Sequence, residues 1–158
     1  MFFIQPSDDE ISRALEAWQW LPIGTKKPIL VTAFGDMFLA GDQGVWFLDT
    51  IEGNLKRICE TEDELRETLE TEDGQNHYLL AGFVERAQRE DMTLADGQCY
   101  DFKLNPVVGG KIEYDNVEVQ DFVVAMNIAG QLHGQVRGMP NGARVSGFTV
   151  DGESPAGP

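Results

Sequence analysis

Apolar residues first recur at helical spacing in the segment SDDEISRALEAW. The segment begins with Ser7, and Glu10 follows three residues later. This spacing predicts a capping box, in which each side chain binds the backbone N–H of the other residue. Ile11, Leu15 and Trp18 then occupy positions i, i+4 and i+7, which lie on one face of an α-helix. The pattern predicts an amphipathic helix, which the proline- and glycine-containing stretch LPIGTKKP ends.

Short runs of β-branched and aromatic residues predict strands after this helix. The runs ILVTAF and VWFLDT have the composition of buried strands, and NLKRICE predicts a third strand after the turn EGN. Between them, the glycines and the aspartate of AGDQG suit a tight turn that joins two apolar runs. The segment therefore predicts an antiparallel meander.

The most strongly helical region covers residues 61–91. Thr61 and Glu64 repeat the capping-box spacing. Gly74 is expected to break or kink the helix. Apolar residues at helical spacing lie on both sides of that glycine: Leu65 and Leu69 before it, and Leu80, Phe83, Val84 and Ala87 after it.

Strict alternation returns in the segment CYDFKL, after the predicted turn ADGQ. It predicts a strand with Tyr100, Phe102 and Leu104 facing inward. Asp101 and Lys103 are expected to face outward, and NPVVGG ends the strand.

The long segment NVEVQDFVVAMNIAGQLHGQVRGMPNG fits either a helix or a strand. We favour a helix that stops near Gly138 and Pro140. RVSGFTV predicts a last strand, and residues 152–158 predict a disordered tail. Together the elements predict one α+β domain over residues 1–151, with a small, twisted, mainly antiparallel sheet packed against several helices.

The charge of the chain is strongly negative, and this narrows the classes of partner. The sequence has 12 Lys and Arg residues against 27 Asp and Glu residues, a formal net charge of −15. Such a charge repels nucleic acid and anionic membrane and favours a basic partner, although it also suits a highly soluble protein with no such partner. The N-terminus lacks the basic region of a signal peptide, and the apolar run FVVAMNIAG is about half the length of a membrane span. We therefore expect a cytoplasmic location.

No motif in the sequence indicates catalysis, a cofactor or a metal. The segment AFGDMFLAGDQGVWFLDT contains three aspartates, but neither Asp36 nor Asp42 begins a set with the spacing of calcium ligands. His77 and His133 are expected at the surface or at a helix cap. A triad of Asp121, His133 and Ser146 could be written down, but no GxSxG elbow surrounds the serine. We expect no enzyme and no cofactor.

An acidic run marks the start of the predicted helical region. Negative charge at a helix N-terminus is favourable, and the run also suits a plain solvated helix face. The alternative is a surface that meets a cationic groove on a partner. The run consists of Glu60, Glu62, Asp63, Glu64, Glu67, Glu70, Glu72 and Asp73.

Three segments give the chain a family resemblance. PILVTAFGDMFLAGDQGVWFLDTIEGNLKRI, GQCYDFKLNPVVGG and FVVAMNIAGQLHGQV resemble a bacterial family whose C-terminal module is shared with type VI secretion immunity proteins. Those proteins neutralise DNase toxins and often carry a GAD-like domain. The resemblance spans roughly residues 15–152, and the chain is more distantly similar to the SUKH superfamily. The resemblance to immunity proteins implies a non-catalytic role in binding and supplies no catalytic residues.

Two functions follow as hypotheses. The first is an immunity protein that occludes a cognate nuclease toxin with its acidic surface. The alternative is a small-ligand or regulatory domain unrelated to toxins. Its pocket would be lined by Trp46, Tyr100, Gly109 and Gly110.

Overall fold

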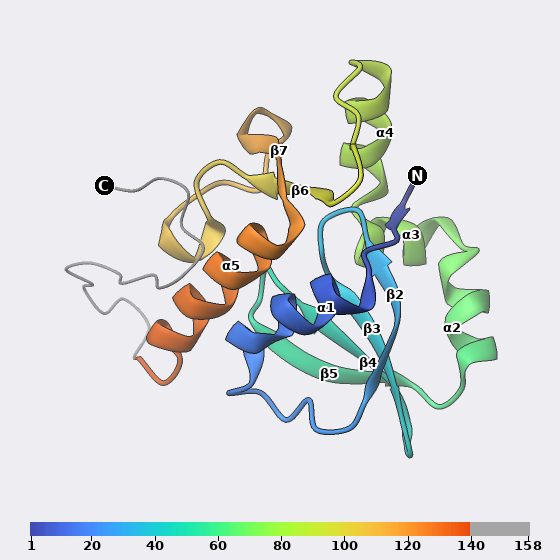
Figure 1. Ribbon diagram of the computed structural model, residues 1–158. Coiled ribbons are helices and arrows are strands. Elements are labelled where there is room, and N and C mark those ends of the chain that lie inside the picture. The colour runs from blue at the N-terminus through green and yellow to red at the C-terminus, as the bar shows by residue number, and fades with distance from the viewer. Residues whose placement is uncertain (140–158) are drawn as a thin grey trace.

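A five-stranded antiparallel sheet forms the centre of the protein in the computed structural model, which describes residues 1–139 (Figure 1). The predicted strand RVSGFTV and the predicted tail at 152–158 lie outside the described residues. The predicted meander is confirmed, and a two-residue strand at the N-terminus extends it. In spatial order the strands are β1 (Phe3–Ile4), β2 (Lys27–Thr32), β3 (Met37–Gly41), β4 (Gly44–Asp49) and β5 (Asn54–Cys59).

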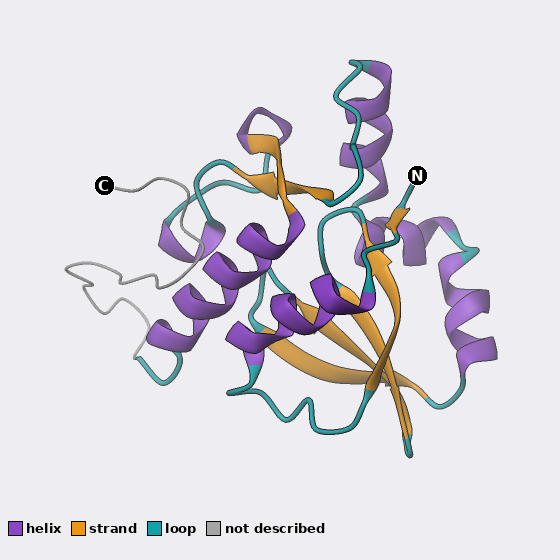
Figure 2. Cartoon of the chain, viewed as in Figure 1, coloured by secondary structure: helices purple, strands orange, loops and turns teal. Residues whose placement is uncertain are grey.

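Helices cover both faces of this sheet. On one face lie α1 (Asp8–Leu15), the 3₁₀ turn η1 (Glu16–Trp18) and α5 (Phe122–Val136) (Figure 2). The side chains of Met37 and Leu39 in β3 pack in one cluster with these helices. The side chain of Phe38 points the other way and packs against the helices of the opposite face. All three side chains are 0% exposed, so the central strand is apolar at successive positions because both of its faces are buried.

Three short helices replace the long helical region predicted for 61–91: α2 (Glu62–Leu69), α3 (Glu72–Leu79) and α4 (Ala81–Arg89). The helical conformation is interrupted at Thr71 and at Leu80, so the predicted interruption of the helix at Gly74 is wrong. The Thr71 hydroxyl accepts a hydrogen bond from the Gly74 N–H and thereby begins α3. Gly74 instead lets the start of α3 lie close to the end of α2, because a Cβ atom at this position would lie 1.9 Å from the Thr68 carbonyl oxygen. Leu80 separates α3 from α4 in the left-handed region, at φ 51°.

A second, two-stranded sheet joins β6 (Gln98–Phe102) to β7 (Val117–Asp121). Tyr100 and Phe102 are buried as predicted. Leu104 is 52% exposed, so its predicted inward orientation is wrong. The strand ends at Phe102, and the chain then enters a loop that contains the short 3₁₀ turns η2 (Pro106–Val108) and η3 (Tyr114–Asn116).

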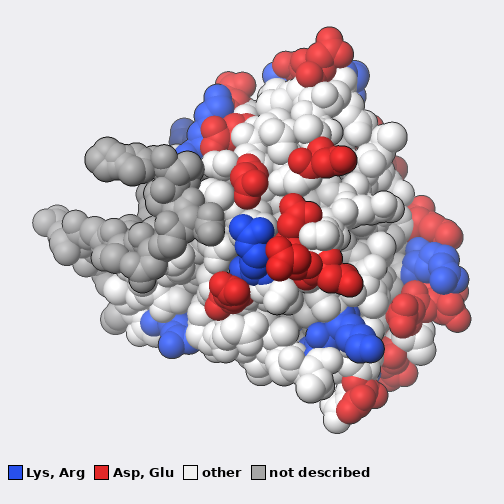
Figure 3. All heavy atoms as spheres, in the orientation of Figure 1, with Lys and Arg blue, Asp and Glu red and all other residues white. Residues whose placement is uncertain are grey.

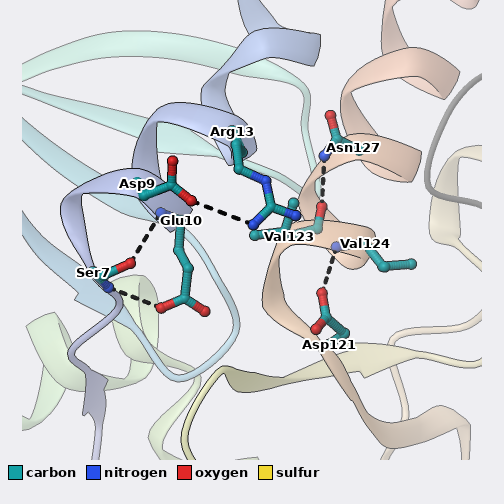
Figure 4. Close-up of polar contacts among 8 residues, drawn as sticks. All are labelled: Ser7, Asp9, Glu10, Arg13, Asp121, Val123, Val124 and Asn127. Atoms are coloured by element: carbon teal, nitrogen blue, oxygen red, sulfur yellow. Dashed lines mark hydrogen bonds and ion pairs between the residues drawn. The ribbon is translucent and has the colours of Figure 1, made fainter.

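The helix predicted within the segment that starts at Asn116 begins later than expected. Residues 117–121 form β7, and α5 starts where the Asp121 carboxylate accepts a hydrogen bond from the Val124 N–H at 2.9 Å (Figure 4). The helix ends at Val136, close to the predicted stop near Gly138. The β-branched residues before Asp121 pair with β6, which explains why this part of the segment also fitted a strand.

Side-chain caps fix two other helix starts. The capping box of α1 is confirmed in both directions, with the Ser7 N–H donating to Glu10 at 2.9 Å and the Glu10 N–H donating to Ser7 at 3.1 Å (Figure 4). At α2 the Glu64 N–H donates to the Thr61 hydroxyl at 3.1 Å, but the Glu64 carboxylate accepts from that hydroxyl instead of the Thr61 backbone.

The predicted α+β class is confirmed. Within residues 1–139, no helix is both long and apolar enough to cross a membrane.

Candidate functional site

The acidic run forms one exposed surface, here called the acidic face. It begins after β5, follows α2 and crosses the break at Thr71 into the first turn of α3. Figure 3 shows acidic side chains gathered at the right-hand edge of the molecule, over α2. All eight members are exposed: Glu60, Glu62, Asp63, Glu64, Glu67, Glu70, Glu72 and Asp73.

Two arginines neutralise part of this face. Arg57 lies 3.9 Å from Glu60, and Arg66 lies 3.1 Å from Asp63. Both pairs are exposed, so each stabilises the fold only slightly. Eight carboxylates against two guanidinium groups leave an excess of six negative charges. Most of the face is therefore available to positive charges from outside the molecule.

The helices that carry the acidic face are fixed to the sheet. Leu65 of α2 is 3% exposed and packs in a cluster with Phe38, Val45 and Phe47 of the sheet and Leu79 of α3. Such a cluster holds the helix by its apolar side and leaves the opposite side in water. The threonine caps and the acids of both first turns also satisfy the positive helix ends. The carboxylates are thus presented on a preformed surface.

The four residues predicted for a ligand pocket have separate local roles. Trp46 of β4 lies under Lys26, whose Nζ is 4.8 Å from the ring centroid. The Tyr100 hydroxyl donates to the Met92 carbonyl at 2.7 Å. Tyr100 lines a hollow of about 590 Å³ beside the N-terminus, which Trp46, Gly109 and Gly110 do not line. The two glycines follow η2, where Gly110 allows the chain to approach the Leu104 carbonyl.

Two of the three aspartates of AFGDMFLAGDQGVWFLDT act in turns, Asp42 as predicted and Asp49 at the end of a segment predicted as a strand. Asp42 is exposed at the tip of the β3–β4 hairpin, where Gly41 pairs with Gly44. The Asp49 carboxylate accepts from the N–H groups of the next turn, at Ile51 and Glu52, at 2.9 and 3.0 Å. Both residues therefore shape the connections between strands.

Asp36 has a role that the sequence did not reveal. It is 3% exposed, and its Oδ1 accepts from the Thr50 N–H at 2.8 Å and from the Thr50 hydroxyl at 2.6 Å. The carboxyl group thus ties the β2–β3 turn to the end of β4. Burial raises the pKa of Asp36 from 3.8 to about 7, although the Thr50 hydrogen bonds oppose the shift. No spacing rule marks such a residue, because its partner is 14 positions away.

We expect Asp36 to make the stability of the protein depend on pH. Between a pKa of 3.8 in the unfolded chain and about 7 in the fold, the native state holds a proton that the unfolded state has lost. The free energy of unfolding should fall as pH rises through this window, by at most about 1.4 kcal/mol per pH unit. Urea unfolding of wild type and Asp36→Asn across the window measures this. The stability difference between them should change with pH, and parallel curves would contradict the assignment.

His133 lies in the interior, so its predicted position at the surface or at a cap is wrong, whereas His77 is exposed as predicted. His133 is 6% exposed, its Nε2 is 2.9 Å from the Thr50 carbonyl oxygen, and burial lowers its pKa. Gly53 makes room for the ring, since a Cβ atom there would lie 2.3 Å from Nδ1.

The hypothetical triad of Asp121, His133 and Ser146 is not assembled. Asp121 lies at the other end of α5 from His133, about 18 Å away at 1.5 Å per residue, so these two residues cannot share a catalytic triad. Ser146 lies outside the described residues.

A second hollow lies between the α3–α4 connection and the loop before η3. Its volume is about 540 Å³, and it is called the α3–α4 groove below. Its residues come from α3, α4 and the loop, and most of its walls are apolar or aromatic. They are Asn76, Leu80, Gly82, Phe83, Arg86, Ile112, Glu113 and Tyr114.

Comparison with known proteins finds a family model that matches part of the chain. Residues 60–133 match the family model described as T6SS immunity protein Tdi1, C-terminal. This match confirms, for slightly less than half of the chain, the resemblance to type VI secretion immunity proteins. The matched segment begins with the first residue of the acidic face and also contains all the residues of the α3–α4 groove. No curated protein matches the chain.

One solved structure supports the fold. The crystal structure of Atu4351 from Agrobacterium tumefaciens has a TM-score of 0.55 with this chain at 21% sequence identity. The match covers 82% of this chain and 65% of the other, so this chain spans somewhat less than two thirds of that protein. At this identity the likeness shows the fold alone.

Proposed function

Because residues 60–133 match the family model for the C-terminal part of a type VI secretion immunity protein, we propose that this protein neutralises a secreted nuclease toxin. In this proposal the acidic face covers the groove in which the toxin holds DNA. The observation that carries the proposal is the excess of six negative charges on a fixed surface within the matched segment. The protein acts as a stoichiometric binder in the cytoplasm and not as an enzyme.

The electrostatic basis of the proposal is the charge that DNA requires of its binding proteins. A nuclease holds the phosphate backbone with lysine and arginine side chains, and those side chains are exposed when DNA is absent. A surface with repeated carboxylates can occupy the same cations. Complementary charge of this kind accelerates the encounter and helps to exclude partners of the wrong sign.

The rigid mounting of the acidic face supports tight binding. Surfaces that order only on binding lose part of their interaction energy to conformational entropy. Here Leu65 anchors α2 in the core, and threonine side chains cap both helices. The backbone that carries the carboxylates is therefore ordered before the toxin arrives, and binding restricts little beyond the side chains themselves.

The proposal predicts protection and complex formation with the toxin encoded by the adjacent gene. Expression of that toxin in a bacterial host should stop growth, and co-expression of this protein should restore it. The two proteins should also co-purify, because a stoichiometric inhibitor protects by remaining bound. Plasmid DNA from the same cells reports whether the toxin is a nuclease. Growth arrest that persists at equal expression, with no co-purification, would reject the proposal.

A further inference from the structure

The α3–α4 groove is an apolar hollow held open by contacts behind its walls. Phe83 of α4 packs against Phe34 and Phe102, with ring centroids 6.2 and 6.4 Å apart respectively. Arg86 lies over the Tyr114 ring, with its guanidinium carbon 4.1 Å from the centroid. These contacts join α4 to the core and to the opposite wall, so the walls are positioned without a ligand.

The loop that forms the opposite wall is also fixed. The Asn116 side chain donates to the carbonyls of Leu104 and Lys111, both at 2.9 Å, and accepts from the Leu104 N–H at 3.0 Å. This clasp holds Ile112 at the rim of the groove with 49% of its surface exposed. Ile112 thereby extends the apolar wall of the hollow into solvent.

Gly82 leaves the groove empty on its α4 side. It lies in the first turn of α4 and is exposed, and a Cβ atom added to it would meet nothing within 4 Å. There is consequently space for a side chain to enter from outside. A hollow of about 540 Å³ is large enough for an aliphatic or aromatic side chain with part of its backbone.

The charges around the groove indicate what such a segment would carry. Glu113 lines the groove, and Asp115 is exposed two residues further along the loop. On α3, Asp73 of the acidic face precedes the groove residue Asn76 by three positions, which places both on one side of the helix. The one cation among the residues lining the groove, Arg86, is paired with Glu90 at 2.8 Å. Lys111 is an exposed cation beside Ile112 on the same loop, but Glu113, Asp115 and Asp73 outnumber it. The rim thus favours a segment with positive charges on both sides of its apolar residue.

We propose that the α3–α4 groove receives one aliphatic or aromatic side chain of the toxin, from a segment in which lysine or arginine flanks it. This inference rests on the proposed function. Because α3 carries acidic residues in its first turn and a groove residue in its second, the groove adjoins the acidic face along this helix. The groove supplies the buried apolar anchor, and the acidic face supplies the charged surroundings.

The test fills the groove without disturbing the core. Gly82→Trp places a ring in the hollow from a helical position that has room for a side chain. Ser12→Trp adds the same ring to an exposed position on α1 and serves as the matched control. The probe is the purified, catalytically inactivated toxin encoded by the adjacent gene, and thermal unfolding checks that both variants fold. Gly82→Trp should weaken binding at least about 30-fold, as loss of an interface hot spot does, while Ser12→Trp binds like wild type.

A second variant and a salt series separate the possible outcomes. Ile112→Asn should also weaken binding, and because neither groove variant changes a charge, neither should change how affinity depends on salt. If both groove variants bind the toxin like wild type, the groove inference is overturned and the proposed function stands. If wild type itself does not bind the toxin, both fail. A wild-type dimer that Gly82→Trp dissociates without affecting toxin binding would assign the groove to a second copy of this chain and overturn the inference.

Discussion

Replacing Trp18 with alanine should lower the free energy of unfolding by about 3–5 kcal/mol, the range measured when large aromatic residues are removed from cores. The Trp18 side chain is 0% exposed, and its Nε1 donates to the Met126 carbonyl of α5 at 3.0 Å. Its ring also stacks on Trp20 at a centroid distance of 5.8 Å. The substitution would therefore leave a cavity where η1 meets α5 and remove the hydrogen bond that joins them.

Urea unfolding followed by circular dichroism measures this loss, and Trp46→Ala provides the comparison. Trp46 is partly exposed, so its removal opens less buried space and should cost less than half as much. Equal losses from the two substitutions would contradict the central position given to Trp18. A loss of 3–5 kcal/mol is large beside the total stability of about 5–15 kcal/mol that is usual for a domain.

Local signals in the sequence were sufficient for much of the fold. The capping box of Ser7 and Glu10, the hairpin turn at AGDQG and the buried face of Tyr100 and Phe102 each depend on residues close together in the chain. Their outcomes agree with the predictions because neighbours within a few residues determine them. The eight acids are likewise exposed, as carboxylates without a buried partner are in folded proteins generally.

The features that the sequence did not reveal depend on contacts between distant residues. From the sequence, Asp36 looks like a turn residue, because its contact with Thr50 exists only in the folded protein. His133 likewise looks like a surface residue, because its contact with the β4–β5 turn depends on where α5 packs. The sequence predicts a helix at 117–121, where β7 is found, because the apolar spacing there fits both states and only pairing with β6 distinguishes them. The α3–α4 groove is of the same kind, since its two walls lie about 30 positions apart in the chain.

Reversing charge on the acidic face should slow association with the toxin by about 10- to 100-fold at low salt, within the roughly 10- to 1,000-fold by which electrostatic steering raises such rates. The change combines Glu62→Lys, Glu67→Lys and Glu70→Lys. All three side chains are exposed on or beside α2, so the fold should tolerate the substitutions. The buried apolar side of α2 at Leu65 is unchanged.

A control with the same net charge removes the effect of total charge. Glu16→Lys, Asp42→Lys and Glu52→Lys also change the formal charge from −15 to −9, but they lie outside the acidic face. Long-range attraction falls equally in both triple variants, whereas only the first loses its local complementarity. The control should therefore associate several-fold faster than the acidic-face variant.

The most direct test of the proposed function measures the association rate constant of wild type and both triple variants with the inactivated toxin across a range of salt concentrations. We predict that wild type associates fastest and is slowed by salt, and that the acidic-face variant is slow at low salt and nearly insensitive to added salt. The control should lie between wild type and the acidic-face variant. Equal rates for the two triple variants, or a wild-type rate independent of salt, would contradict the claim that the acidic face binds the toxin.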